Sequence, residues 1–289
     1  MLKLVETLQR RTSRQRLKIS IPVLAPAAPR KPLAIVAIAR DEAEYLREWL
    51  EFHLMMGAEH VYLYDNQSSD DTRGLVRSYE DRNLVTRINW PNPSTESPQL
   101  TAYADAIVRF GRFWRWMAFI DIDEFLYSGR SSSVVDVLQS SFADHAAVEV
   151  AWRNFGFSGH ASKPAGPVIE SYTARAPMDV EDDQLRKVKS IVDPCRVSTV
   201  FSAHRFTLRD GSPTRLPAES GELRINHYFT KSRDEFERKL AQQAVFWGNV
   251  RHSAQREVER RHDIAAAVER APVRDDEILR FVPALRARL

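Results

Sequence analysis

The sequence alternates short apolar segments with amphipathic helical segments through its first half, and this alternation constrains the fold more than any other feature. Residues 33–39 form a continuous apolar run, which is typical of a strand buried on both faces of a sheet. Residues 41–56 follow with apolar side chains at helical spacing, and Gly57 is a natural end for that helix. The same pattern predicts further elements in alternation: strands at 60–64, 84–89, 116–122 and 147–152, and helices at 71–79, 99–114 and 134–142. Such an order predicts an α/β fold with a mainly parallel sheet flanked by helices.

The second half of the chain has a less regular pattern. Strands are predicted at 197–206 and 223–229. Ser232 to Glu235 has the capping-box pattern of a helix start, and that helix runs towards Phe246. The remainder is charged and helical. We therefore predict three parts: a basic extension with a Pro/Ala linker at 1–31, one α/β domain at 32–250, and a helical C-terminal extension at 251–289.

Charge is distributed unevenly along the chain. Residues 1–31 hold eight Lys and Arg against one Glu, a net +7, which leaves −4 for the rest of a 289-residue chain whose formal charge is +3. The single Cys195 excludes an intrachain disulfide, and no apolar run is long enough for a membrane helix. We expect a cytoplasmic protein whose basic segment either contacts an anionic membrane or polysaccharide, or is simply solvated.

Three acids, Asp121, Asp123 and Glu124, stand at the end of the hydrophobic strand predicted at 116–122. Ligands of open α/β sheets bind beyond the carboxyl ends of the strands, so the acids would reach such a site from a rigid support. Two carboxylates one residue apart can share a divalent cation, and Mg²⁺ or Mn²⁺ typically adds phosphate oxygens. The alternative is a solvated turn, which the preceding apolar residues disfavour because unpaired buried carboxylates are costly.

Other polar residues lie in or after predicted strands. Asp65 and Asn66 follow the second strand, where an acid can bind a ribose hydroxyl or a base edge, although Asx residues also simply turn the chain. Residues 40–42 (RDE) follow the first strand, and acids there suit a helix dipole without any function. His227 lies inside an apolar strand, either as a core residue or as a further ligand for a carboxylate-bound metal.

Two later segments contain residue types that suit ligand binding. Residues 152–160 include Gly156 and Gly159, which permit close backbone approach, and Lys187 and Lys189 can neutralise phosphate. Each segment could equally be a plain loop or a solvated strand.

Together these motifs resemble glycosyltransferase family 92, which is of the GT-A type and related to the family 2 transferases. They occur in the family's order across about residues 33–285. The matching segments are Arg40-Asp41-Glu42 with Glu48-Trp49, 64–70 (YDNQSSD), 119–125 (FIDIDEF), 152–160 (WRNFGFSGH), 189–194 (KSIVDP), and 226–229 (NHYF) with Lys231-Ser232. Two positions depart from the pattern: the first loop lacks the frequent Asn-Glu, and Phe157 replaces a small Ser, which bears on acceptor or donor fit.

The resemblance implies transfer of a sugar from a nucleotide diphosphate donor, UDP-linked, to a glycan or other hydroxyl acceptor, with inversion and with Mn²⁺ or Mg²⁺. It implies that Asp121 and Asp123 bind the metal and that His227 lies beside it. The residues expected to bind the donor are Arg40, Glu42, Asp65, Asn66, Asp121 and Lys189. The residues expected in the acceptor region are Trp152, Phe155, Gly156, Ser158, Gly159 and His160.

An inverting displacement also needs a general base near the acceptor hydroxyl, and a carboxylate suits that role. Asp182 and Asp183 are candidates by composition and position only, and the alternative for both is a solvated acidic loop. Glu170 and Glu222 are weaker candidates.

Two other functions compete with this interpretation. A phosphatase of the haloacid dehalogenase type also has D-x-D after a strand, but its pair follows the first strand and precedes Thr or Val. Here three strands precede the pair and Glu124 follows it. The other is a non-catalytic protein that binds a polyanion or a membrane surface through residues 1–31. No specific nucleic acid is expected as a partner.

Overall fold

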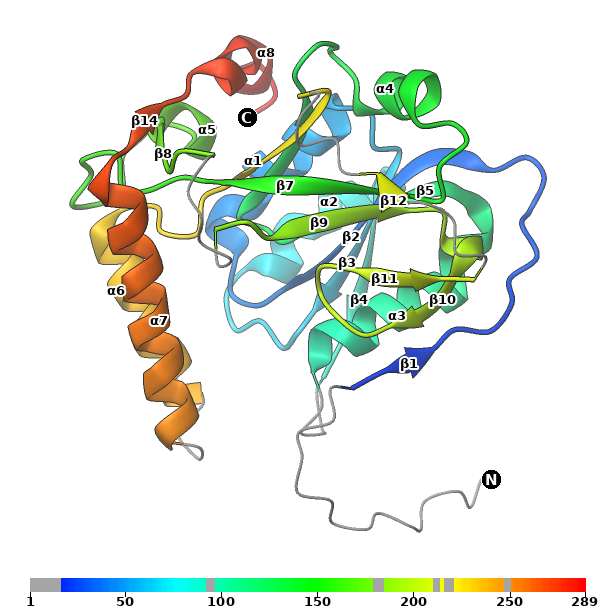
Figure 1. Cartoon of the computed structure of the whole chain (residues 1–289), viewed down its shortest axis with the longest axis horizontal. Coiled ribbons are helices and arrows are strands. Elements are labelled where there is room, and N and C mark those ends of the chain that lie inside the picture. The colour runs from blue at the N-terminus through cyan, green and yellow to red at the C-terminus, as the bar shows by residue number, and fades with distance from the viewer. Residues whose placement is uncertain (1–16, 92–96, 179–184, 210–213, 216–220, 247–250) are drawn as a thin grey trace.

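The computed structural model of the chain describes residues 17–91, 97–178, 185–209, 214–215, 221–246 and 251–289 (Figure 1). Within these residues, nine strands form one sheet in the order β4-β3-β2-β5-β9-β7-β13-β6, with β12 paired to β7. The strands are β2 Lys31–Ala39, β3 His60–Asp65, β4 Val85–Asn89, β5 Trp114–Phe119, β6 Glu124–Ser128, β7 Ala147–Asn154, β9 Val188–Val192, β12 Thr214–Arg215 and β13 Leu223–His227. The predicted α/β fold with a mainly parallel sheet is confirmed.

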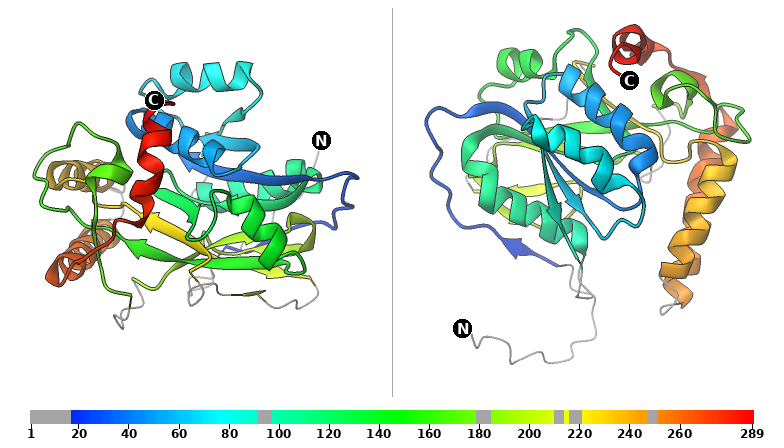
Figure 2. Two further views of the ribbon diagram at one scale, coloured as in Figure 1. Left: turned by 90° about the horizontal axis from the view of Figure 1, so that it is seen from above. Right: turned by 180° about the vertical axis from the view of Figure 1, so that it is seen from behind.

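The first half of the sheet consists of four parallel strands, β4-β3-β2-β5. Side chains alternate along β2: Leu33 and Ile35 pack into one core, whereas Ala34 and Val36 pack into a second core on the opposite face. This explains the continuous apolar run, since both faces of the strand are covered. One core includes α1 Ala43–Met55, α2 Thr72–Asp81 and α4 Val134–Ser141, and the other includes α3 Pro98–Phe110. Helices α1 and α2 lie side by side (Figure 2).

The second half of the sheet mixes strand directions. Strand β9 runs antiparallel to both β5 and β7, while β13 is parallel to β7 and antiparallel to β6. The predicted strand 116–122 ends at Phe119, because the chain turns there and returns as β6, a strand that the sequence pattern did not predict. The predicted helix 99–114 ends at Phe110 and is followed by a short 3-10 helix, η1 Gly111–Phe113, before β5.

A smaller sheet covers part of one face. It has the order β1-β10-β11, from β1 Ile19–Ser20, β10 Val197–Val200 and β11 Phe206–Leu208. The single strand predicted at 197–206 is therefore two antiparallel strands. A further 3-10 helix, η2 Pro194–Arg196, joins β9 to β10.

Helices α6 Arg233–Phe246 and α7 Arg251–Arg270 lie side by side next to the sheet (Figure 1). The predicted capping box is confirmed: the Ser232 backbone N–H and hydroxyl both donate to the Glu235 carboxylate, and the Glu235 N–H donates back to the Ser232 hydroxyl. Phe236 and Leu240 of α6 pack with Val268 of α7 in a separate small core. This packing fixes the side of α6 that faces α7 and the loop residues of this small core.

The chain then returns to the main core. Strand β14 Val273–Arg274 pairs with β8 Ala174–Arg175, which follows the short helix α5 Val168–Ser171. Beyond it lie η4 Glu277–Phe281 and α8 Val282–Arg286, and Ile278, Phe281 and Leu285 are buried in the same core as α1. Among the described residues, no helix is long and apolar enough to cross a membrane.

Candidate functional site

The turn from Asp121 to Glu124, which joins β5 to β6, is the centre of the candidate site. The Glu124 N–H donates to the Asp121 carbonyl (3.1 Å) and closes the turn. The Trp49 indole N–H of α1 donates to two carbonyls of the turn, those of Asp121 (3.0 Å) and Glu124 (2.8 Å). The Tyr228 N–H donates to the Asp123 carbonyl (2.8 Å). Elements far apart in the sequence therefore hold the turn in one conformation.

Asp121 faces Lys189, which lies on the central strand β9. The Lys189 ammonium donates to the Asp121 carboxylate (2.8 Å), as does the Gln99 amide (2.7 Å). Lys189 also lies 3.5 Å from the carboxylate of Glu124, and the side chains of Lys189 and Glu124 are 1% and 0% exposed. Burial alone would lower the pKa of Lys189, but Asp121 and Glu124 outweigh it and raise the pKa. Lys189 is thus a buried counter-ion for both acids.

Glu124 is fully buried beneath the turn. Its Oε2 atom accepts a hydrogen bond from the Asp121 N–H (3.0 Å), whereas its Oε1 atom accepts no hydrogen bond and lies 3.5 Å from the Lys189 ammonium. Burial raises the pKa of Glu124 well above its usual value, although Lys189 opposes the shift. A buried carboxylate oxygen that accepts no hydrogen bond is suited to a proton or to a closer cation.

Asp123 faces the opposite side of the turn. Its Oδ2 atom lies 3.1 Å from the Lys239 ammonium of α6, and its Oδ1 atom lies 3.8 Å from Nε2 of His227. Lys239 also lies 3.6 Å from the Glu42 carboxylate. Burial would raise the pKa of Asp123, but Lys239, His227 and Lys231 together outweigh burial and hold the pKa far below its usual value. Asp123 is therefore an ionised acid.

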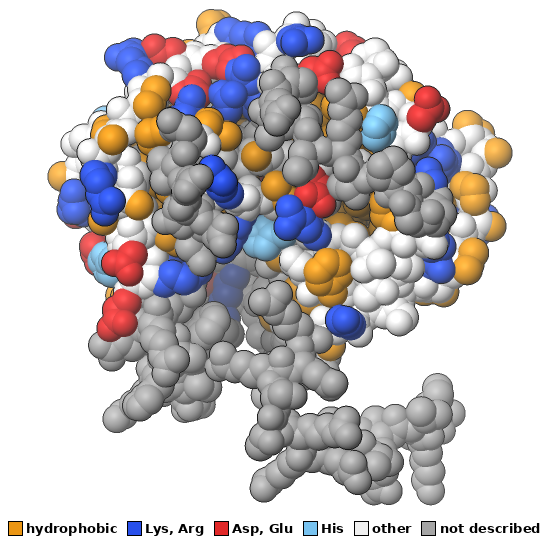
Figure 3. Space-filling view, viewed as in Figure 1, with side chains coloured by type: hydrophobic (Ala, Val, Ile, Leu, Met, Phe, Trp, Pro, Cys, Tyr) orange, Lys and Arg blue, Asp and Glu red, His pale blue; other side chains and the backbone are white. Residues whose placement is uncertain are grey.

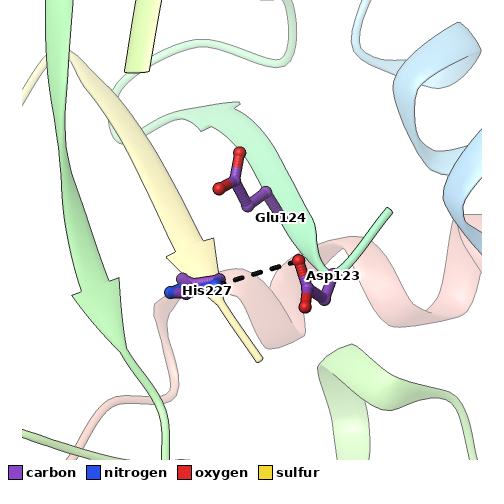
Figure 4. A group of neighbouring side chains, drawn as sticks. All are labelled: Asp123, Glu124 and His227. Atoms are coloured by element: carbon purple, nitrogen blue, oxygen red, sulfur yellow. Dashed lines mark ion pairs between the residues drawn. The ribbon is translucent and has the colours of Figure 1, made fainter. Parts of the chain in front are cut away.

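His227 ends β13 and points its Nε2 atom towards Asp123 (Figure 4). Its Nδ1 atom lies 2.9 Å from the side-chain oxygen of Asn154, and the Asn154 amide group donates to the Leu185 carbonyl (2.9 Å). Because the amide donates to Leu185, its oxygen accepts from His227, and these contacts assign the proton to Nδ1. Burial lowers the pKa of His227 to about 4 despite the nearby acids. A neutral imidazole with its Nε2 lone pair towards an acid is a metal-ligand arrangement.

Asp123, Glu124 and His227 each place one ligand atom within 4.8 Å of the others (Figure 4). Two carboxylates and one neutral imidazole fit Mn²⁺ or Mg²⁺. This group overlaps with the predicted set Asp121, Asp123 and His227, but it contains Glu124 in place of Asp121. Asp121 instead lines the adjoining pocket and is bound by Lys189 and Gln99.

A pocket of about 290 Å³ opens beside this group, lined by ends of β2 and β7 and by α6 and α7. Its charged lining has more basic than acidic side chains. Figure 3 shows Lys and Arg side chains, with acidic ones among them, on the face seen in Figure 1. Trp152 and Phe229 contribute aromatic walls. The charged lining residues are Arg40, Glu42, Asp121, Asp123, Lys187, Lys239, Arg260 and Arg261.

The predicted donor residues differ in their positions relative to the pocket. Arg40 and Glu42 line the pocket. Asp65 ends β3, beside the β2 residues that line the pocket, and Asn66 follows it. Both hold loops: Asp65 pairs with an Arg side chain at position 87 (2.9 Å), and the Asn66 amide donates to the carbonyl of residue 90 (2.9 Å). Lys189 is buried in its ion pairs and is not among the described residues that line the pocket.

Of the predicted acceptor residues, Trp152 lines the pocket. The others shape the loop that follows β7: Phe155 is buried in the core, the Ser158 hydroxyl accepts two backbone N–H groups, and the His160 ring contacts the carbonyl of residue 171. Gly159 has a φ of +81°, which favours glycine. A side chain at Gly156 would meet residues of α7. None of these five is among the described lining residues.

The predicted general bases cannot be placed at the pocket. Asp182 and Asp183 lie outside the described residues. Glu170 pairs with Arg286, and Glu222 accepts a hydrogen bond from a serine of α4, so both are engaged elsewhere.

Sequence reasoning missed Gln99, Lys239, Arg260 and Arg261, all of which line the pocket. The capping box predicted the helix that carries Lys239, but no local motif marks the lysine itself. The apolar spacing of Phe236 and Leu240 was the available signal, because it identifies the helix face that packs inward.

Comparison with known proteins matches the model of glycosyltransferase family 92 to residues 34–264. A glycosyltransferase family 92 protein of Ricinus communis is 31% identical over 227 residues, which are 75% of this chain and 39% of the relative. One of Oryza sativa subsp. japonica is 28% identical over 224 residues, 74% of this chain and 37% of the relative. The chain therefore spans about two fifths of the length of these relatives.

Solved structures give more distant similarities. S. aureus TarS in complex with UDP has 13% identity and a TM-score of 0.36, over 57% of this chain and 47% of that chain. The mannosyltransferase PcManGT from Pyrobaculum calidifontis, in complex with GDP-Man and Mn²⁺, has 16% identity and a TM-score of 0.32, over 45% of this chain and 38% of that chain.

Proposed function

Because the chain belongs to glycosyltransferase family 92, we propose that it transfers a sugar from a nucleotide diphosphate donor to a hydroxyl acceptor, using a divalent cation. The observation that carries this proposal is the group Asp123, Glu124 and His227 at a pocket with a surplus of basic side chains. Acids that can hold a cation, beside a basic pocket, suit a ligand that is itself a polyanion. A nucleotide diphosphate has this charge.

The chemistry explains why both charge signs are needed. When the sugar leaves the donor, negative charge develops on the diphosphate, and a bound Mn²⁺ or Mg²⁺ stabilises that charge as a Lewis acid. Asp123 and His227 would hold the ion, with Glu124 beneath them. Lys187, Arg260 and Arg261 line the same pocket and would bind donor phosphates. Trp152 offers an aromatic surface for the base or the sugar.

Several finer features belong to the same proposal. The donor is UDP-linked, the reaction inverts the anomeric carbon, and the acceptor is a glycan or another hydroxyl compound. Asp182 or Asp183 acts as the general base, and Asp65 and Asn66 lie near the nucleotide. The enzyme works in the cytoplasm, and its basic residues 1–31 bring it to an anionic membrane or polysaccharide. The family's motif order supports the donor, the inversion and the acceptor. The composition and position of Asp182 and Asp183 support their role, and the net charge of +7 on residues 1–31 supports the surface contact.

The test is hydrolysis and transfer with a panel of nucleotide sugars, in Mn²⁺, in Mg²⁺ and in excess chelator. We expect release of nucleoside diphosphate from a UDP sugar with either ion and its loss with chelator. Asp123→Asn should reduce release about 10²–10³-fold. Glu59→Gln, which changes an exposed acid outside the pocket, should not reduce it. Absence of binding and turnover with every donor would contradict the proposal, and release of phosphate from simple phosphoesters would favour a phosphatase.

A further inference from the structure

The Lys239 ammonium pairs with Asp123, an acid of the proposed metal site. Its ammonium is 3.1 Å from Oδ2 of Asp123 and 3.6 Å from the Glu42 carboxylate, and the side chain lines the same pocket as both acids. Asp123 is also the acid that faces the Nε2 atom of His227. A lysine of this chain and the proposed divalent cation would therefore bind the same carboxylate.

The helix that carries Lys239 is firmly placed, but the end of its side chain is not enclosed. Phe236 and Leu240, on either side of it in α6, are 2% and 3% exposed. The Lys239 side chain is 30% exposed, whereas that of Lys189, on the other side of the turn, is 1% exposed. A lysine head group on a flexible four-carbon stem can move away into solvent while its helix stays in place.

An ammonium group and a divalent cation that bind the same carboxylate repel each other. Both are positive, and like charges a few ångströms apart repel strongly in a partly buried site. Removing either cation without the other would leave Asp123 and Glu42 with only water and more distant charges as compensation. The contacts therefore fit an exchange, in which one cation replaces the other.

We propose that Lys239 is a tethered cation that occupies Asp123 until a divalent ion displaces it. This inference rests on the metal site of the proposed function. The displaced ammonium stays in the pocket, where it is available to the phosphates of the donor. Metal and donor then bind cooperatively, because the ion frees a cation for the donor and the donor's phosphates hold that cation away from Asp123. The ion alone binds weakly, since it first has to break the Lys239 contacts.

In the experiment the full chain is titrated with Mn²⁺ alone. Calorimetry measures the binding, and the electron paramagnetic resonance signal measures the free Mn²⁺. We expect Lys239→Met to bind Mn²⁺ about tenfold more tightly than the wild type, which corresponds to about 1.4 kcal/mol. Lys239→Arg keeps the charge and should bind within about twofold of the wild type, a difference below about 0.5 kcal/mol.

Two matched variants separate exchange from a general change in charge. Lys187→Met removes a charge from the same pocket, where Lys187 lies over the Trp152 ring, and should change Mn²⁺ affinity much less than Lys239→Met. Adding UDP should tighten Mn²⁺ binding more in the wild type than in Lys239→Met, because only the wild type has the tethered ammonium to move. Circular dichroism and thermal melting confirm that each variant is folded.

The possible failures can be told apart. If the wild type binds Mn²⁺ and Lys239→Met binds it no more tightly, or if Lys187→Met tightens binding equally, the exchange is wrong while the metal site stands. If neither protein binds Mn²⁺ and Asp123→Asn changes nothing, the metal site itself is wrong, and the exchange falls with it.

Discussion

The two sides of the Asp121–Glu124 turn use the same ion-pair chemistry in different surroundings. On the Lys189 side, defined by Lys189, Asp121 and Glu124, the lysine comes from the middle of the sheet and is 1% exposed. On the Lys239 side, defined by Lys239, Asp123, Glu42 and His227, the lysine comes from a helix beside the sheet and is 30% exposed. Burial therefore distinguishes them more than residue type does.

This difference teaches which charges are structural and which can be exchanged. A buried ion pair cannot lose one partner without leaving a desolvated charge, so the Lys189 side is expected to support the fold. A partly exposed pair has water as an alternative partner, so the Lys239 side can change partners when a ligand arrives. One turn thus combines a fixed half and a replaceable half.

The largest effect expected is on the fixed half. Lys189→Met leaves Glu124 and Asp121 without their shared counter-ion, and we expect the free energy of unfolding to fall by about 3–5 kcal/mol. Urea denaturation followed by circular dichroism measures this. If Lys189→Met is as stable as the wild type, the Lys189 side is not a structural ion pair, and the contrast between the two sides is lost.

On the replaceable half, the main effect is on activity. Asp123→Asn removes the charge that holds the proposed cation, and we expect kcat/KM to fall about 10²–10³-fold, as when one electrostatic group of a transition state is removed. Its free energy of unfolding should fall by less than that of Lys189→Met, because the Lys239 contact is partly solvated. A loss of stability that equals the loss with Lys189→Met would contradict the comparison.

A buried histidine of α1, next to β6, allows a pH-dependent test of how burial affects stability. His53 of α1 accepts the Leu126 N–H at Nε2 (3.1 Å), and burial lowers the pKa of His53 to about 3. Its unfolded form takes up a proton below about pH 6.5, so this contribution to stability is present above that pH and is lost as pH falls towards 3. The stability difference between wild type and His53→Gln should therefore shrink by about 2 kcal/mol from pH 7 to pH 5, at about 1.4 kcal/mol per pH unit.

Urea denaturation of both proteins at the two pH values provides this measurement. The difference isolates His53 from other titrating groups, some of which act in the opposite direction: burial raises the pKa of Glu124, so acid favours its neutral folded form. A difference that does not depend on pH would show that His53 is not held neutral by burial.

The smallest effect is expected for Lys239, the partly exposed lysine. Lys239→Met should change the free energy of unfolding by about 1 kcal/mol or less, since partly solvated ion pairs contribute little. The comparison with Lys189→Met in the same urea series is the direct test of the two halves. Equal losses for the two lysine variants would mean that burial does not separate them.

Much of the fold follows from local patterns. The continuous apolar runs predicted β2, β3 and β5 close to their observed positions, and the capping box predicted the start of α6. The prediction failed where the chain reverses without a strong turn signal. Strand β6 was missed because residues 119–125 resemble the end of one strand followed by acids. The antiparallel strand that stabilises β6 is β13, which lies about a hundred residues later in the sequence.

The predicted site shows the same limit. Asp121, Asp123 and His227 line one pocket, as expected from strand ends that meet at one edge of a sheet, while their predicted role in metal binding stays a prediction. Their division was not predictable: Asp121 faces Lys189, and Asp123 faces Lys239, which is 116 residues away in sequence. Asp182 and Asp183 remain a prediction, since they lie outside the described residues.

The sequence by itself determined the alternating elements, the family, and the apolar strand that delivers three acids to a turn. Those features are local, because side-chain period, capping residues and motif order are written along a short stretch of chain. Only the tertiary structure decided which acids meet the buried Lys189 and which meet the partly exposed Lys239. Burial depends on what covers a residue from distant parts of the chain, and burial sets whether a charge is held or exchanged.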